Sequence, residues 1–99
     1  MSKYGVTLSP GRVAEQTASR VKQLRKQAGY SQLELAERSE VSLGSLKRFE
    51  QTGKVSLDNL LRLLQVLGRL EELNGILLPT PDLEHTTRRA KEMGDAERI

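Results

Sequence analysis

The sequence contains no cysteine, no tryptophan and a single histidine. Without cysteine there can be no disulfide and no thiolate metal site. The histidine, His85, lies in a polar segment with no neighbour that could complete a metal site or a catalytic triad. Because a glycine-rich phosphate loop and paired carboxylates are missing as well, we expect no enzyme activity, no metal and no cofactor.

Long apolar stretches and aromatic side chains are also scarce. Nowhere do about 18 apolar residues run together, and the start of the chain lacks the apolar stretch of a signal peptide, so we expect a soluble cytoplasmic protein without membrane contact. The hydrophobic fraction is 36%, and Tyr4, Tyr30 and Phe49 are the only aromatic residues. A chain of 99 residues makes one domain, whose modest core would gain stability from oligomerisation.

The charge is distributed unevenly along the chain. Residues 1–30 carry six basic residues and one acidic residue, whereas residues 57–99 carry six basic and eight acidic residues. The positive first third could attract a polyanion such as nucleic acid. It could equally be the solvated lysine and arginine face of an ordinary helix, so charge alone leaves both interpretations open.

Five helices and no strand are expected from the residue pattern, which makes the fold class all-α. The first helix begins after Ser9, with Pro10 in its first position, and ends at Gly29. Its apolar stripe has spacings of three and four residues and consists of Val13, Thr17, Val21, Leu24 and Ala28.

The second and third helices are short and close together. Ser31 starts the second helix, with Glu34 at the capping-box spacing, and Ser42 starts the third, which ends at Gly53. The side chains expected to be buried are Leu33, Leu35, Ala36, Val41, Leu46 and Phe49. Two short helices joined by a brief turn form a helix-turn-helix, here residues 32–52. The second helix of such a unit enters the major groove of DNA.

The remaining helices are expected at about residues 56–68 and 70–78, followed by Pro79 and Pro81. The leucines of the earlier one are expected to face the core of the domain rather than a partner. An arm (residues 1–8) and a polar tail (residues 79–99) would flank the domain (residues 9–78), and residues 86–93 could form a marginal helix.

A homodimer is expected from the geometry of DNA. One recognition helix covers only a few base pairs, so specific binding needs two copies on a two-fold operator. The predicted dimer seam lies on the last helix and consists of Leu70, Leu73, Ile76 and Leu77. The alternative is that these side chains only close the core of the monomer.

Four short stretches carry a family resemblance: residues 24–36 (LRKQAGYSQLELA), Val41-Ser42, Phe49-Glu50 and Gly53-Lys54. Together they resemble the phage-repressor-type helix-turn-helix family, also called XRE or Cro/C1. The resemblance implies that double-stranded operator DNA is the partner and that an ion pair joins Arg25 to Glu50. It further implies a DNA-contacting set of Gln32, Ser42, Leu43, Gly44, Ser45, Lys47, Arg48 and Lys54.

Within that set, Leu43, Gly44, Lys47 and Arg48 are expected to face bases, and Gln32, Ser45 and Lys54 to face phosphates. Two departures from the family pattern stand out. Glu40 occupies the turn position that is usually glycine, so either the turn differs or a non-glycine residue is left-handed, at a cost of about 1 kcal/mol. Amides are common where Leu43 and Gly44 stand, which shifts base choice toward Lys47 and Arg48.

A narrower resemblance rests on Val55-Ser56-Leu57, residues 63–70 and Leu77-Leu78-Pro79. These stretches resemble HipB-type antitoxins, which repress their own operon as dimers and bind a HipA-type kinase toxin. Free-standing regulators share the same motifs, so a stand-alone or phage-derived repressor is an alternative. A helix-turn-helix that bridges proteins without reading DNA is another.

Overall fold

The computed structural model describes residues 8–81, which form five helices and no strand. The helices are α2 (Pro10–Gln27), α3 (Gln32–Ser39), α4 (Leu43–Thr52), α5 (Leu57–Val66) and α6 (Leu70–Asn74). The all-α expectation is confirmed. The predicted arm and tail lie mostly outside these residues, and the helix considered for residues 86–93 lies wholly outside them.

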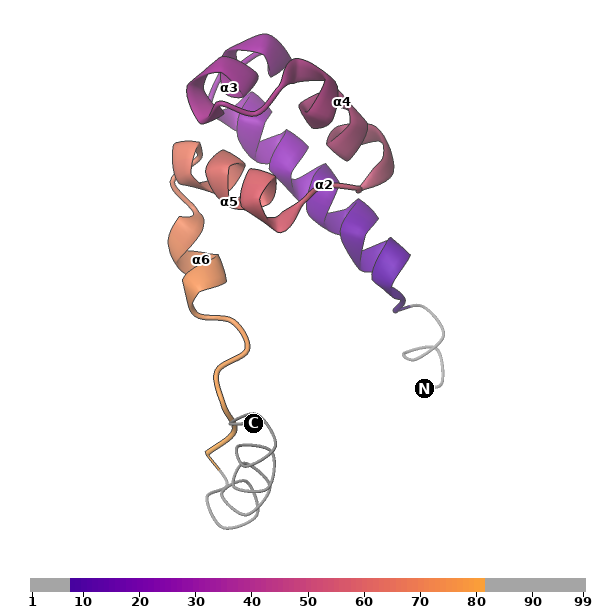
Figure 1. Cartoon of the computed structure of the whole chain (residues 1–99), viewed down its shortest axis with the longest axis vertical. Helices are drawn as coiled ribbons and strands as arrows, with labels where there is room; N and C mark the ends of the chain where they lie inside the picture. The colour runs from indigo at the N-terminus through magenta and orange to yellow at the C-terminus, as the bar shows by residue number, and fades with distance from the viewer. Residues whose placement is uncertain (1–7, 82–99) are drawn as a thin grey trace, which may run out of the picture.

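The long helix α2 runs along the body of the domain, and the shorter helices α3, α4 and α5 lie around it (Figure 1). It packs against α4, while α3 packs against both α4 and α5. The last helix, α6, contacts α5 and extends away from the body of the domain (Figure 1). Within residues 8–81, no helix is long and apolar enough to cross a membrane.

Serine side chains set the starts of four helices, as predicted. In each case the hydroxyl accepts a hydrogen bond from the backbone N–H three residues later, which satisfies one of the free donors of the first turn. These caps are Ser9, Ser31, Ser42 and Ser56. Ser31 and Glu34 form the full capping box, and its hydrogen bonds lower the pKa of the Glu34 carboxyl.

The core lies where α2, α3, α4 and α5 meet. Its fully buried large side chains are Leu35, Leu46, Phe49 and Leu63. Four predictions of burial are wrong. Leu57, expected to face the core with the other leucines of its helix, is 64% exposed at the first position of α5, and Ala28 is exposed just after the end of α2. Leu33 is 52% exposed, because it precedes the buried Leu35 by two positions and therefore lies on the opposite side of α3. Val13 is 42% exposed, because the first turns of α2 extend beyond the shorter helices packed on it (Figure 1).

The last helix is shorter than predicted. It ends at Asn74 rather than near Leu78, and no side chain caps its start. Asn74 and Gly75 are poor helix formers, and Pro79 disfavours helical geometry at the residue before it. Leu77 instead takes a left-handed conformation with φ 61°.

Candidate nucleic-acid interface

Helix α4 has one face in the core and one face in solvent. Leu46 and Phe49 are buried, whereas Gly44, Lys47 and Arg48 are exposed. The structure therefore presents these three residues together, as the sequence analysis expects of base-reading positions. Leu43 differs from expectation: it is half-buried and packs against the core, because it lies three residues before Leu46 on the same side of the helix.

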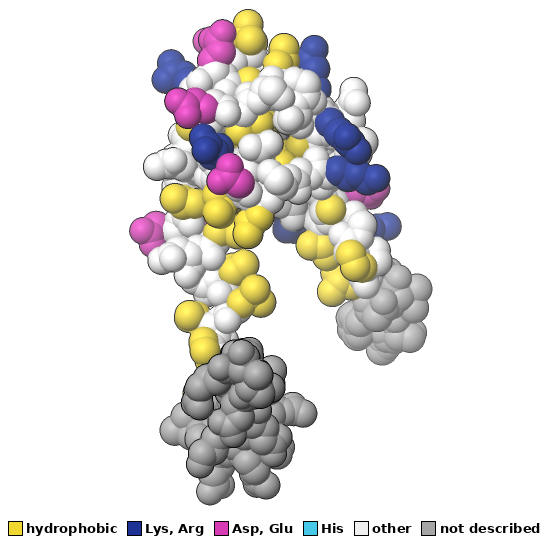
Figure 2. Space-filling view, in the orientation of Figure 1, with side chains coloured by type: hydrophobic (Ala, Val, Ile, Leu, Met, Phe, Trp, Pro, Cys, Tyr) yellow, Lys and Arg dark blue, Asp and Glu magenta, His cyan; other side chains and the backbone are white. Residues whose placement is uncertain are grey.

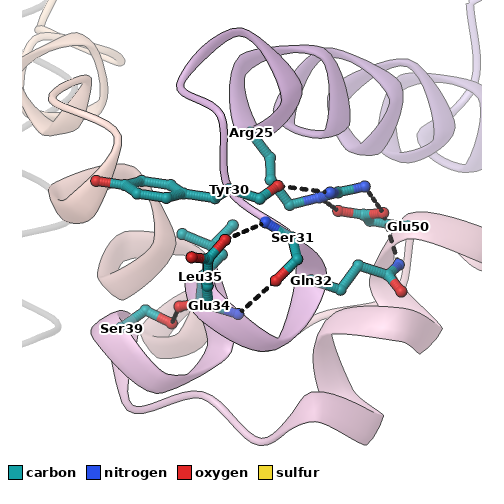
Figure 3. Close-up of polar contacts among 8 residues, drawn as sticks. All are labelled: Arg25, Tyr30, Ser31, Gln32, Glu34, Leu35, Ser39 and Glu50. Atoms are coloured by element: carbon teal, nitrogen blue, oxygen red, sulfur yellow. Dashed lines mark hydrogen bonds and ion pairs between the residues drawn. The ribbon is translucent and has the colours of Figure 1, made fainter.

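An ion pair holds α4 against α2 from its buried side (Figure 3). Arg25 donates from Nε to Glu50 Oε2 at 2.8 Å and from Nη2 to Glu50 Oε1 at 3.1 Å. Its Nη1 donates to the Tyr30 carbonyl at 2.9 Å. The Arg25 and Glu50 side chains are only 8% and 3% exposed. This bidentate geometry fixes the orientation of α4 as well as its position.

Gln32 is tied into the same network. It is the first residue of α3, and its Nε2 donates to Glu50 Oε1 at 2.9 Å (Figure 3). The half-buried Gln32 side chain thus links the start of α3 to α4. A helix start presents free backbone N–H groups and attracts anions such as phosphate.

The turn between α3 and α4 contains Glu40 in the left-handed conformation, with φ 60° and ψ 32°. Of the two possibilities left by the sequence, the structure has the left-handed residue rather than a different turn. The Glu40 carboxylate accepts a hydrogen bond from Arg62 at 3.3 Å, and Arg62 also donates to Asp58 at 2.9 Å. Asp58, and after it Glu40, raise the pKa of Arg62. These exposed contacts connect the turn to α5.

The loop after α4 lies directly against α2. Gly53 ends α4 with φ 83°, and a Cβ there would stand 2.9 Å from the Ala14 carbonyl carbon. Only glycine fits both the conformation and the approach. Beyond Gly53, a polar cavity of about 250 Å³ opens between α4 and α5. Its lining consists of Ser45, Arg48, Lys54, Val55, Ser56 and Asn59.

The helix-turn-helix family model matches residues 21–73, which is more than half of the chain. The chain belongs to this family, in its XRE type. It is accordingly a DNA-binding transcription regulator. No curated protein matches the sequence.

In this helix-turn-helix protein the predicted DNA-contacting residues gather in three places: on α4 and at the cap before it, at the start of α3, and in the loop after α4. Arg48 and Lys54 share the polar cavity, although the sequence analysis gives them different roles. Ser56 and Asn59 also line this cavity, although the sequence analysis included neither in the DNA-contacting set. Ser56 could have been found from the sequence, because it is a helix cap that stands two residues after Lys54. No sequence signal points to Asn59.

Proposed function

We propose that the chain is a transcriptional repressor that binds operator DNA with α4 in the major groove. The observation that carries the proposal is the division of α4 into two faces. Its buried side is fixed by Phe49 and by the Arg25–Glu50 pair, and its free side carries Lys47 and Arg48. A rigidly held helix with exposed basic side chains suits base recognition, since the donors must be placed accurately against base edges.

Each interface residue has a role in this proposal. Lys47 and Arg48 donate to guanine O6 and N7, and the exposed part of Leu43 contacts a thymine methyl. Gly44 lets the backbone approach the bases. The phosphate contacts come from Gln32, Ser42, Ser45 and Lys54, which position the helix without reading sequence.

The repressor acts as a homodimer in this proposal, because two α4 helices about 34 Å apart are needed for a two-fold operator. The predicted seam residues Leu70, Ile76 and Leu77 are exposed and available to a partner. Leu73 is half-buried and packs against the core, so it also serves the monomer.

Binding to DNA from upstream of the protein's own gene tests the proposal. Wild type should shift this fragment in the presence of excess unrelated DNA at about 150 mM salt, and Lys47→Ala should weaken the shift. Lys22→Ala, an exposed lysine of α2 outside the interface, is the matched control and should bind as wild type does. Weak binding of all fragments that collapses with salt would instead favour a protein-bridging module.

We further propose a narrower role, that of an antitoxin bound to a HipA-type kinase toxin. An antitoxin needs a second surface that stays free while DNA is bound and while α6 forms the dimer seam, and we assign this surface to residues 82–99, which lie outside the described residues. Toxin binding there could alter repression by linkage. Co-expression with the adjacent gene product tests this role. If no neighbour co-purifies and none is toxic alone, the chain is a stand-alone repressor.

A further inference from the structure

An apolar groove lies between α5 and α6, away from the polar cavity of the DNA interface. Its volume is about 410 Å³. Its apolar lining consists of Leu57, Leu61, Leu70, Leu73 and Ile76, and Glu71 is the charged residue at its edge. Leu57, Leu70 and Ile76 are all exposed. Large apolar side chains gathered in this way are typical of an interaction site, whereas single exposed leucines are not.

Directly beside this groove, Leu77 and Leu78 form an exposed apolar pair, which we call the hook. Leu77 is 91% exposed and Leu78 is 72% exposed, and neither lines the groove of its own chain. Figure 2 shows hydrophobic side chains along this projecting part of the molecule. Leu77 also has φ 61°, a conformation that a bulky residue rarely adopts. Such strain persists where surrounding contacts enforce it, and an exposed side chain has few contacts within its own chain.

We propose that the groove receives the hook of a second copy of this chain, and that each copy gives its hook to the other. The chemistry of the two parts is matched. Residues 74–81 carry no charged side chain, so the hook can enter an apolar groove without burying a charge. Pro79 and Pro81 stiffen the segment, which reduces the entropy lost on docking.

A second copy of the chain suits this groove, because each copy carries one groove and one hook, and a pair of copies can therefore occupy both grooves with no hook left over. The groove and the hook lie on neighbouring elements, and a two-fold axis between two copies lets both hooks dock at once. Any other partner would have to leave the hook exposed or supply a groove of its own. This inference rests on the proposed operator binding for its purpose, and it extends the predicted seam to Leu57 and Leu61 on α5 and to Leu78.

The association of the full chain in solution tests the inference without DNA. Sedimentation equilibrium from about 1 to 100 μM should show a wild-type dimer, and Leu77→Ser/Leu78→Ser should raise its Kd at least tenfold. The control is Leu33→Ser, an exposed leucine of α3, which should leave the Kd unchanged. A monomeric wild type, or a dimer that is indifferent to the hook variant, overturns the proposal.

Mixing two defective variants separates hook exchange from a general apolar patch. Leu57→Glu spoils the groove but keeps the hook, and Leu77→Ser/Leu78→Ser does the reverse. Each should be monomeric alone, whereas their mixture retains one intact hook and groove and should form heterodimers. A mixture that stays monomeric refutes the exchange. Both variants should still bind a DNA fragment that carries one half-site. Lys47→Ala should lose this binding and still dimerise. The failure of the proposed operator binding can thus be distinguished from the failure of the proposed hook exchange.

Discussion

Replacing Arg25 with alanine should destabilise the domain by about 3–5 kcal/mol, which is the cost of leaving a buried charge without its partner. The Glu50 carboxylate would keep only one hydrogen bond, from Gln32 at 2.9 Å, although its side chain is 3% exposed. The Tyr30 carbonyl would lose its guanidinium donor at the same time. Glu50→Ala should cost a similar amount, because the Arg25 guanidinium would keep only the Tyr30 carbonyl.

The double variant Arg25→Ala/Glu50→Ala removes both charges together. It should lose less than the sum of the single losses, by about 1–3 kcal/mol. Urea unfolding followed by circular dichroism measures each free energy, and equal m-values show that the denatured states are comparable. Arg25→Lys keeps the charge but loses the bidentate hydrogen bonding to Glu50, so its stability should lie between those of wild type and Arg25→Ala. Strictly additive losses would refute the reasoning.

Three further predictions concern glycine, pH and DNA contacts. Thermal unfolding should show that Gly53→Ala costs about 1–3 kcal/mol more than Gly29→Ala, because both have φ near 82° but only Gly53 has backbone 2.9 Å from the added Cβ. The lowered pKa of Glu34 stabilises the fold above its unfolded pKa of about 4.3, and this contribution is lost as pH falls through the folded pKa. Glu34→Gln should therefore lose less stability than wild type between pH 7 and pH 3 in urea titrations; equal losses would contradict this. Arg48→Ala should relax preference at one base pair by about 1–3 kcal/mol, whereas Lys54→Ala should weaken all sequences alike and reduce the salt slope by about one. Equal effects of Arg48→Ala on operator and random DNA in a binding titration would place Arg48 on a phosphate.

Local chemistry accounts for what the sequence predicts well. The serine caps before α2, α3, α4 and α5 act within four residues, so their spacing is sufficient to place the helix starts. Burial depends instead on how helices pack. The sequence could not show that α2 extends beyond its neighbours and exposes Val13. The exposure of Leu33, by contrast, follows from helical spacing, because Leu33 precedes the buried Leu35 by two positions.

The candidate site likewise has a part that could be predicted from the sequence and a part that depends on how the helices pack. The residue types of α4 and the partners Arg25 and Glu50 were predictable, but from the family resemblance rather than from spacing. The shared cavity of Arg48, Lys54 and Asn59 was not, because it depends on the path of the loop between α4 and α5. That path is set by the close approach of Gly53 to α2, which no local pattern reveals.

A substitution at Gly44 can distinguish what the fold requires at this position from what DNA binding requires. A Cβ at this position would meet nothing within 4 Å, and its φ lies outside the left-handed region. Nothing in the described part of the chain therefore requires glycine there, although glycine in a helix costs about 0.5–1 kcal/mol relative to alanine. Gly44→Ala should accordingly raise the free energy of unfolding by up to about 1 kcal/mol. If α4 approaches the bases through its backbone at Gly44, the same variant should weaken operator binding, as measured by titration of labelled DNA. A variant that is more stable and binds the operator as tightly as wild type would show that the backbone does not come close to DNA at this position.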